Sequence, residues 1–151
     1  MSAFISKENV LLNQHAATRE EVLRIISNYA VELGAADDAD AVYEGFMFRE
    51  NLDKTGLTEG FAIPHCKTAA IKHAAVIPFK NDKAIEWPSF DEQPVDIAMA
   101  LLVPESEAGD THIRLLSKTA VLLMDADFKK LLRESDDAEA IAEAINKEIQ
   151  S

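Results

Sequence analysis

The chain has 151 residues, 48% of them hydrophobic, which predicts one folded domain over residues 1–151 and argues against a disordered chain. Its 15 basic and 27 acidic side chains give a formal net charge of −12, which argues against binding nucleic acid or an anionic membrane, because both require clustered cations. With a single cysteine, Cys66, the chain cannot form an internal disulfide.

The N-terminal segment, MSAFISKENVLLNQHAATREE, has neither the basic start nor the long apolar stretch of a signal peptide. The longest apolar runs, such as VDIAMALLV at 95–103, are far too short to cross a bilayer. We therefore expect a soluble cytoplasmic protein. Its two ends resemble those of a full-length protein, which favours a free-standing chain.

Two helices are predicted in the first third of the chain. Apolar residues recur at helical spacing up to Leu33, namely at Val22, Ile25, Ile26 and Tyr29. Thr18 and Glu21 have the Thr-x-x-Glu spacing of a capping box, and Gly34 stands where a C-cap glycine is expected. The stretch DADAVYEGFMFREN at 38–51 predicts a second helix, which ends before the turn-rich LDKTGLTEG.

Short strands are predicted next, at 61–63 (FAI), 74–79 (AAVIPF), 84–87 (AIEW) and 95–103. Helices follow at 111–124, around 126–135 and around 137–150. This order of helices, a block of strands and more helices predicts an α/β domain, with helices packed on a mostly buried mixed sheet.

The helix predicted at 111–124 has a defined apolar stripe and a candidate cap. Asp110 or Thr111 is the expected N-cap. The stripe that should face the core consists of Ile113, Leu116, Ala120 and Leu123.

The chemically distinctive segment is GFAIPH at 60–65, because it places His65 directly after a proline. Pro64 has its φ fixed at about −65° and pushes Ile63 toward extended geometry, so the imidazole is held at a strand end with little backbone freedom. A neutral imidazole is a competent nucleophile near neutral pH. Metal ligand, general base and core residue are the other roles open to it.

A metal centre is the weakest of these alternatives. A zinc site needs three or four convergent ligands, most of which His65, Cys66 and His112 would have to supply. Adjacent residues of an extended strand point to opposite faces, so His65 and Cys66 are poorly placed to bind one ion. His15, His73 and, taken alone, His112 are expected at the surface. We expect no metal and no cofactor.

Several other kinds of site lack support in the sequence. There is no Gly-x-Ser-x-Gly elbow, no P-loop and no Gly-x-Gly-x-x-Gly motif, so neither a serine hydrolase nor a nucleotide-binding protein is indicated. A phosphoryl group can still come from a protein donor. Arg49, at the end of the second predicted helix, has a planar guanidinium suited to phosphate oxygens.

Two stretches, FRENLDKTGLTEGFAIPHCK at 48–67 and GDTHIRLLSKTAVLL at 109–123, resemble the enzyme IIA domain of the fructose–mannitol class of the bacterial sugar phosphotransferase system. The resemblance covers nearly the whole chain. It implies the mannitol-type enzyme IIA fold, a mixed β-sheet flanked by helices on both sides.

The resemblance also implies a function and a set of site residues. His65 would accept a phosphoryl group from the phosphocarrier protein HPr and pass it to a IIB domain, which serves the membrane-embedded IIC transporter. We therefore expect the imidazole to be presented on the surface, where two proteins can reach it in turn. His112 matches a second histidine that supports the phosphorylated ring, and Arg49 matches an arginine that stabilises the phosphoryl charge or orients the site.

Three further positions match the family pattern around this site. Glu59 matches an acidic position of mannitol-type members, and Thr55 with Gly56 matches the turn that shapes the pocket. One position departs from the pattern, since many members have glycine or alanine where this chain has Cys66. That difference leaves the nucleophile in place.

Two alternatives to a sugar-transport component remain within this fold. Nitrogen-type IIA proteins keep the histidine but regulate partners according to phosphorylation state. A scaffold without transfer activity is the other alternative, and the intact Arg49, His65 and His112 argue against it. The sequence does not indicate which sugar or polyol is served, because a IIA domain does not hold the sugar.

Overall fold

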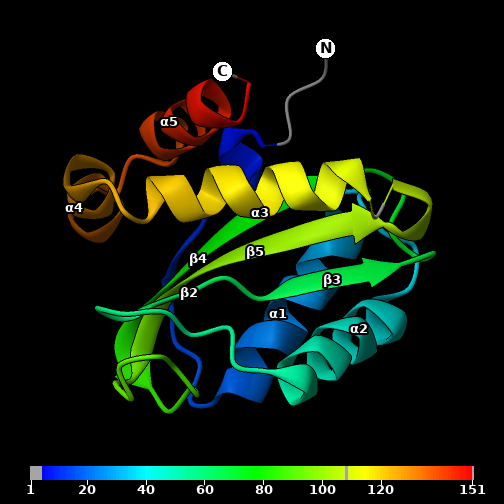
Figure 1. Ribbon diagram of the computed structural model, residues 1–151, viewed down its shortest axis with the longest axis horizontal. Helices are drawn as coiled ribbons and strands as arrows, with labels where there is room; N and C mark the ends of the chain where they lie inside the picture. The colour runs from blue at the N-terminus through cyan, green and yellow to red at the C-terminus, as the bar shows by residue number, and fades with distance from the viewer. Residues whose placement is uncertain (1–4, 108, 151) are drawn as a thin grey trace.

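The described residues, 5–107 and 109–150 of a computed structural model, form three layers, with a mixed sheet between two sets of helices (Figure 1). The helices are η1 (Lys7–Asn9), α1 (Arg19–Glu32), α2 (Ala39–Leu52), η2 (Glu105–Glu107), α3 (Asp110–Leu122), α4 (Ala126–Glu134) and α5 (Ala138–Ile149). α1 and α2 cover one face of the sheet, and α3 and α5 cover the other. The predicted fold class is confirmed.

The sheet has five strands, and β5 lies at its centre. The strands are β1 (Leu11–Gln14), β2 (Phe61–Ala62), β3 (His65–Thr68), β4 (Ala75–Ile85) and β5 (Val95–Pro104). β4 and β5 are antiparallel, whereas β1 runs parallel to β4 and both β2 and β3 run parallel to β5. β2 and β3 therefore occupy successive parts of the same side of β5 in a single register, and Ile63 and Pro64 lie between them.

The sequence of β5 is apolar because both faces of this strand are buried. Ala98 and Leu102 belong to the core beneath α1 and α2, while Ile97 and Leu101 belong to the core beneath α3 and α5. Successive side chains of a strand alternate between faces, so a strand covered on both faces needs apolar residues at every position. The sheet is thus a rigid base for residues at its edge.

The ends of α1 are formed largely as the sequence predicts. The Thr18 side chain accepts a hydrogen bond from the Glu21 backbone N–H at 3.1 Å. The Glu21 carboxylate accepts from the backbone N–H of Ala17 rather than from that of Thr18. Gly34 follows the helix with φ of +79°, a left-handed conformation that glycine adopts without steric cost.

The strand predictions were incomplete. Most of 74–79 and the first two residues of 84–87 belong to one strand, β4, whose register with β5 shifts between Lys80 and Ile85. β1 and β3 were not predicted at all. Both have four residues and partly polar sequences, and their hydrogen bonds come from β4 and β5, which lie far away in the chain.

The prediction for α3 was wrong at its cap and on part of its stripe. Gly109 is the N-cap, and no side chain caps the helix there. Ile113 is 63% exposed, whereas Leu115 and Leu122 are buried against the sheet. Apolar residues surround much of this helix, so tertiary packing selected a face that periodicity alone did not determine. Among the described residues, no helix has the length and apolarity needed to span a membrane.

Candidate functional site

The backbone around Pro64 fixes the position of His65. The Ile63 N–H donates to the carbonyl of Thr55 at 3.0 Å, and the Leu101 N–H donates to the carbonyl of Pro64 at 2.9 Å. His65 is the first residue of β3 and pairs with Leu101 of β5. The predicted strand at 61–63 ends at Ala62, so His65 opens a second strand instead of following the first.

Both ring nitrogens of His65 have partners, and these partners define the tautomer. The Arg49 Nε–H donates to His65 Nε2 at 2.9 Å, so Nε2 carries a lone pair. Nδ1 lies 2.9 Å from the carbonyl oxygen of Ile63, which can only accept. The arrangement therefore corresponds to a neutral imidazole protonated on Nδ1.

The electrostatic surroundings also favour the neutral ring. Burial lowers the pKa of His65 to about 4, and the positive charges of Arg49 and Lys67 and the neighbouring His112 act in the same direction, against the hydrogen bond to Ile63. At neutral pH the ring is uncharged, so Nε2 needs no base to become nucleophilic.

His65 is less accessible than the sequence suggested. We expected an imidazole presented on the surface, but the residue is only 6% exposed. It lies in a pocket of about 240 Å³. The pocket is lined by Gly45, Phe48, Arg49, Leu52, His65, Lys67 and His112. α2 supplies four of these residues, and it lies along β3 (Figure 1).

His112 enters the pocket from the first turn of α3. Its ring centroid is 5.1 Å from that of His65, and the two ring planes are inclined by 49°. Burial, followed by the charges of Lys67 and Arg49, lowers the pKa of His112, so it too is neutral at neutral pH. Its Nδ1 is buried and has no hydrogen-bond partner among the described residues, which leaves one ring nitrogen available.

Arg49 is held so that its guanidinium faces the histidine. Its Nη1 donates to the carbonyl of Asp53 at 2.7 Å, directly after α2 ends, while its Nε reaches His65. The same side chain thus closes the end of its own helix and contacts the candidate nucleophile.

Thr55 and Gly56 support the pocket from behind without lining it. Thr55 is 4% exposed, and its carbonyl accepts the Ile63 N–H. A Cβ on Gly56 would lie 2.4 Å from the carbonyl oxygen of Pro88 and 2.6 Å from Cβ of Ser89. Only glycine allows these two backbone segments to approach so closely.

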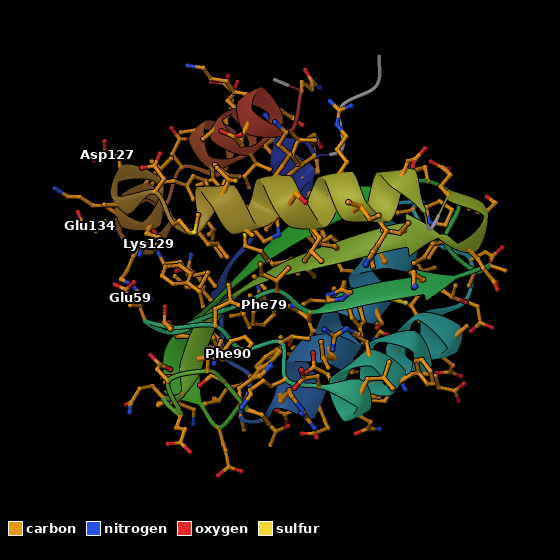
Figure 2. All side chains as sticks on the ribbon, in the orientation of Figure 1. Glu59, Phe79, Phe90, Asp127, Lys129 and Glu134 are labelled. Carbon is orange, nitrogen blue, oxygen red and sulfur yellow. The ribbon has the colours of Figure 1, made fainter. Side chains whose placement is uncertain are left out.

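Glu59 does not line the pocket either, and its side chain contacts a different element. Its carboxylate pairs with Lys129 of α4 at 2.6 Å, and its side chain is 64% exposed (Figure 2). Its backbone is in the left-handed region, with φ of 60°, and its N–H donates to Asp91. Glu59 therefore connects the loop before β2 to α4.

Four pocket residues were not assigned from the sequence: Gly45, Phe48, Leu52 and Lys67. Lys67 is two residues from His65 in a strand, so it lies on the same side of β3, and this spacing was a usable signal. Phe48 and Leu52 are in the same helix turns as Arg49. Their exposed apolar side chains had no distinguishing signal in the sequence.

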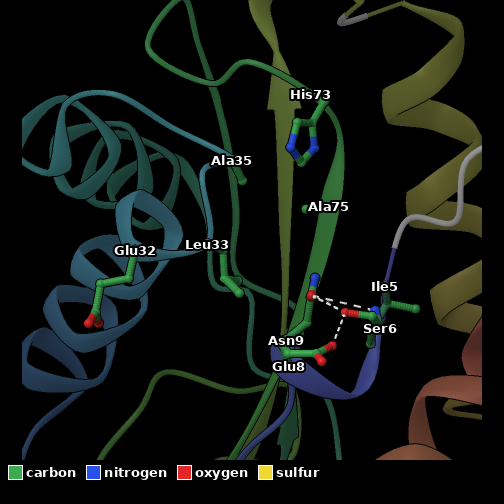
Figure 3. A pocket seen from close by; sticks show the side chains of 9 residues that line it. All are labelled: Ile5, Ser6, Glu8, Asn9, Glu32, Leu33, Ala35, His73 and Ala75. Carbon is green, nitrogen blue, oxygen red and sulfur yellow. Dashed lines mark hydrogen bonds between the residues drawn. The ribbon is translucent and has the colours of Figure 1, made fainter.

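A larger pocket, of about 470 Å³, lies elsewhere and shares no residue with the one around His65 (Figure 3). It lies between η1, the end of α1 and the start of β4, and Ser6, Glu8 and His73 are among its residues. His73 and His15 are exposed, as expected. Among the described residues, no group of three His, Cys, Asp or Glu side chains could hold a metal ion.

The chain is similar to known proteins over nearly its whole length. Residues 3–148 match the family model described as "Phosphoenolpyruvate-dependent sugar phosphotransferase system, EIIA 2". The chain is 30% identical over 146 residues to a "PTS system fructose-specific EIIABC component" of Bacillus subtilis, covering 97% of the chain but 23% of that relative's length. It is 32% identical over 135 residues to a "Nitrogen regulatory protein" of Pseudomonas aeruginosa, covering 89% of the chain and 87% of the relative.

Solved structures show the same fold. The nitrogen regulatory protein IIA-Ntr from Neisseria meningitidis superposes with a TM-score of 0.85 at 25% identity, covering 94% of this chain and 96% of that one. IIA mannitol from Escherichia coli superposes with a TM-score of 0.76 at 20% identity, covering 93% and 98%. Relatives with transport names and relatives with regulatory names are thus both similar to this chain.

Proposed function

The chain belongs to the EIIA 2 family of the phosphoenolpyruvate-dependent sugar phosphotransferase system, and on that premise we propose that His65 carries a phosphoryl group between two protein partners. The observation that carries the proposal is the neutral His65 ring, with Nδ1 bonded to the Ile63 carbonyl and Nε2 capped by Arg49 inside a pocket. Chemically, this is a prepared nitrogen nucleophile beside a cation.

The first step transfers the phosphoryl group from a phosphohistidine of HPr. Nε2 of His65 attacks the phosphorus, and a new N–P bond forms as the donor's N–P bond breaks. The donor imidazole leaves with the bonding electron pair. Arg49 gives up its hydrogen bond to Nε2 in this step and donates to the phosphoryl oxygens instead.

The pocket supplies the remaining charge stabilisation. Arg49 and Lys67 are cations in the lining of the pocket that holds His65, and a phosphoryl group is stabilised by cations and N–H donors around its equatorial oxygens. His112 has a buried ring nitrogen without a partner, which makes it the candidate to bond the phosphorylated ring or a phosphoryl oxygen. The group then passes to a IIB domain by the reverse chemistry, and that domain serves a IIC transporter.

Exposed apolar side chains around the pocket support access by protein partners. Phe48 and Leu52, both in the pocket lining, are 67% and 65% exposed, and Ile113 next to His112 is 63% exposed. Apolar side chains at the surface favour contact with a protein partner. His65 is recessed below them, so a partner's reacting residue has to enter the pocket.

We propose sugar or polyol uptake as the main role, with the chain acting in the cytoplasm as one domain over residues 1–151. A nitrogen-type regulatory role is the second candidate, because the Pseudomonas relative is matched over 87% of its length whereas the Bacillus relative is matched over 23%. The two roles differ in the final acceptor. Transfer from the phosphorylated chain to IIB proteins supports transport, and phosphorylation without any such transfer supports regulation.

The deciding experiment is intact mass spectrometry after incubation with phosphoenolpyruvate, enzyme I and HPr. We expect one acid-labile phosphoryl adduct on the wild type and on the exposed-histidine control His73→Ala, and none on His65→Ala. A folded wild-type protein that gains no adduct would contradict the proposed function.

A further inference from the structure

We propose that Glu50 is a positioning residue of this site, because its buried carboxylate holds the Thr55 turn and, through that turn, the Ile63 carbonyl that fixes the His65 ring. The consequence for phosphoryl transfer rests on the proposed function. The consequence for the ring itself holds for the unphosphorylated protein.

Glu50 and Arg49 are neighbours in α2 but point to different places. Arg49 reaches His65 in the pocket, whereas the Glu50 side chain is completely buried. Successive residues of a helix are about 100° apart around its axis, so one turn can supply both a pocket residue and a buried one. Glu50 takes no part in the pocket lining, and the chemistry above does not use it.

The hydrogen bonds around Glu50 have a defined direction. The indole N–H of Trp87 can only donate, and it donates to Thr55 Oγ1 at 3.3 Å. The Thr55 hydroxyl hydrogen is then free to donate to Glu50 Oε2, at 2.5 Å. Glu50 is therefore the final acceptor of a chain that runs from Trp87 through Thr55.

Thr55 continues this chain to the candidate nucleophile through its backbone. Its carbonyl accepts the Ile63 N–H at 3.0 Å, and the Ile63 carbonyl lies 2.9 Å from His65 Nδ1. Each carbonyl and N–H in this series belongs to a buried residue. A displacement of the Thr55 turn thus reaches the oxygen that keeps the proton on Nδ1 and the lone pair on Nε2.

The energetic cost of Glu50 favours a positioning role over a purely stabilising one. Its Oε1 is buried without a hydrogen-bond partner among the described residues, and the nearest cation, Arg19, is 3.7 Å away. Burial raises the pKa of the Glu50 carboxyl, and the bond from Thr55 and the charges of Arg19 and Arg49 oppose this only in part. An apolar side chain would avoid the cost, since buried carboxylates are expensive unless fully paired.

Four variants test the proposal: Glu50→Leu, Glu50→Gln, Thr55→Val and, as a matched control, Thr119→Val. Glutamine retains an oxygen that accepts from Thr55, whereas leucine does not. Thr119 is fully buried like Thr55, but its hydroxyl has no partner among the described residues. Long-range ¹H–¹⁵N spectra give the His65 tautomer, and the indole N–H of Trp87, the only tryptophan, reports the bond to Thr55.

We expect Glu50→Leu and Thr55→Val to mix the His65 tautomers, to shift the Trp87 indole resonance and to slow phosphoryl uptake about ten- to a hundred-fold, as small misplacements of reacting groups do. Glu50→Gln should restore the tautomer and most of the rate, and Thr119→Val should change none of the three readouts.

An unchanged His65 tautomer in both Glu50→Leu and Thr55→Val overturns the proposal, and so does a changed tautomer with an unchanged rate. If Glu50→Leu does not fold, Thr55→Val decides, because valine has nearly the shape of threonine. If the wild type is never phosphorylated, the proposed function fails, while the tautomer still tests the positioning of the ring.

Discussion

Arg49 Nε donates a hydrogen bond to His65 Nε2 across 2.9 Å, so an arginine at the end of α2 occupies the lone pair of the candidate nucleophile. The contact holds the ring with its unprotonated nitrogen, Nε2, toward the pocket. It also keeps a cation next to the place where phosphoryl charge would develop. The same contact disfavours protonation of His65. This one side chain thus contributes to the orientation of the ring, to its neutral charge state and to the stabilisation of phosphoryl charge, alongside burial and the Ile63 carbonyl.

Replacing Arg49 by alanine should therefore slow phosphoryl uptake from HPr by about a hundred-fold, the usual loss on removing one donor to a developing charge. Arg24→Ala is the matched control, because Arg24 is a surface residue paired with Asp40 and placed over the Tyr43 ring. Rates are measured by quenched-flow with phosphorylated HPr. An Arg49→Ala rate equal to that of the control would remove Arg49 from the mechanism.

The lowered pKa of His65 makes a prediction about stability and pH. The folded-state value of about 4 lies below the ordinary value of 6.5, so between these pH values the unfolded chain binds a proton that the folded chain does not. The contribution of His65 to the free energy of unfolding is therefore fully present above pH 6.5. It is lost as the pH falls to 4, which lowers the free energy of unfolding by about 3 kcal/mol in total.

Urea unfolding of the wild type and of His65→Gln at several pH values measures this effect. The difference in free energy of unfolding between the two should shrink as the pH falls from 6.5 to 4. Glu50, whose pKa is raised, acts with the opposite sign, and His112, whose pKa is lowered, acts with the same sign. Both groups are present in both proteins, so their effects largely cancel in the difference. A difference in free energy of unfolding that does not change with pH would contradict the prediction.

Gly56 should tolerate no side chain. Its Cβ would lie 2.4 Å from the carbonyl oxygen of Pro88 and 2.8 Å from Cα of Ser89, both backbone atoms. Gly56→Ala is therefore expected to lower the free energy of unfolding by about 1–3 kcal/mol, the usual cost of overpacking. Gly109→Ala is the control, because nothing lies within 4 Å of its Cβ. Equal stability of the two variants in urea unfolding would contradict the prediction.

Cys66 and Gly45 form a complementary pair across the contact of β3 with α2. A Cβ on Gly45 would lie 2.4 Å from Cys66 Sγ, and the thiol also lies 3.4 Å from the carbonyl oxygen of Val42. Gly45→Ala should thus destabilise the protein by about 1–3 kcal/mol. In a Cys66→Ala background the same substitution should cost much less, since the clashing sulfur is absent.

A double-mutant cycle of these two positions, followed by thermal unfolding, measures the coupling directly. If the effects of Gly45→Ala and Cys66→Ala on stability are additive, the thiol is not the cause of the destabilisation, and the prediction is contradicted. The pair also accounts physically for a residue larger than glycine or alanine after His65: the facing helix position is a glycine.

Much of the local structure followed from the sequence. The Thr18 cap, the Gly34 conformation and the rigid approach through Pro64 depend on residues close together in the chain, so short patterns predicted them. β1 and β3 were missed because four-residue strands with polar residues have no periodic signal of their own. Ile113 was placed on the wrong face because the packing partner of α3, rather than its periodicity, determined which side is buried.

The sequence by itself was enough for the family, through the resemblance of two motif-bearing stretches, for the fold class, through the order of the predicted elements, and for the stiff segment that carries His65, through Pro64. Only the tertiary structure showed that Nε2 is the unprotonated nitrogen of His65 and that the ring is recessed rather than presented on the surface. It also showed that Glu59 contacts α4 instead of the pocket. Each of these depends on atoms brought together from distant parts of the chain by packing on the sheet. A short stretch of sequence cannot indicate the energy of contacts between residues that are far apart in the chain.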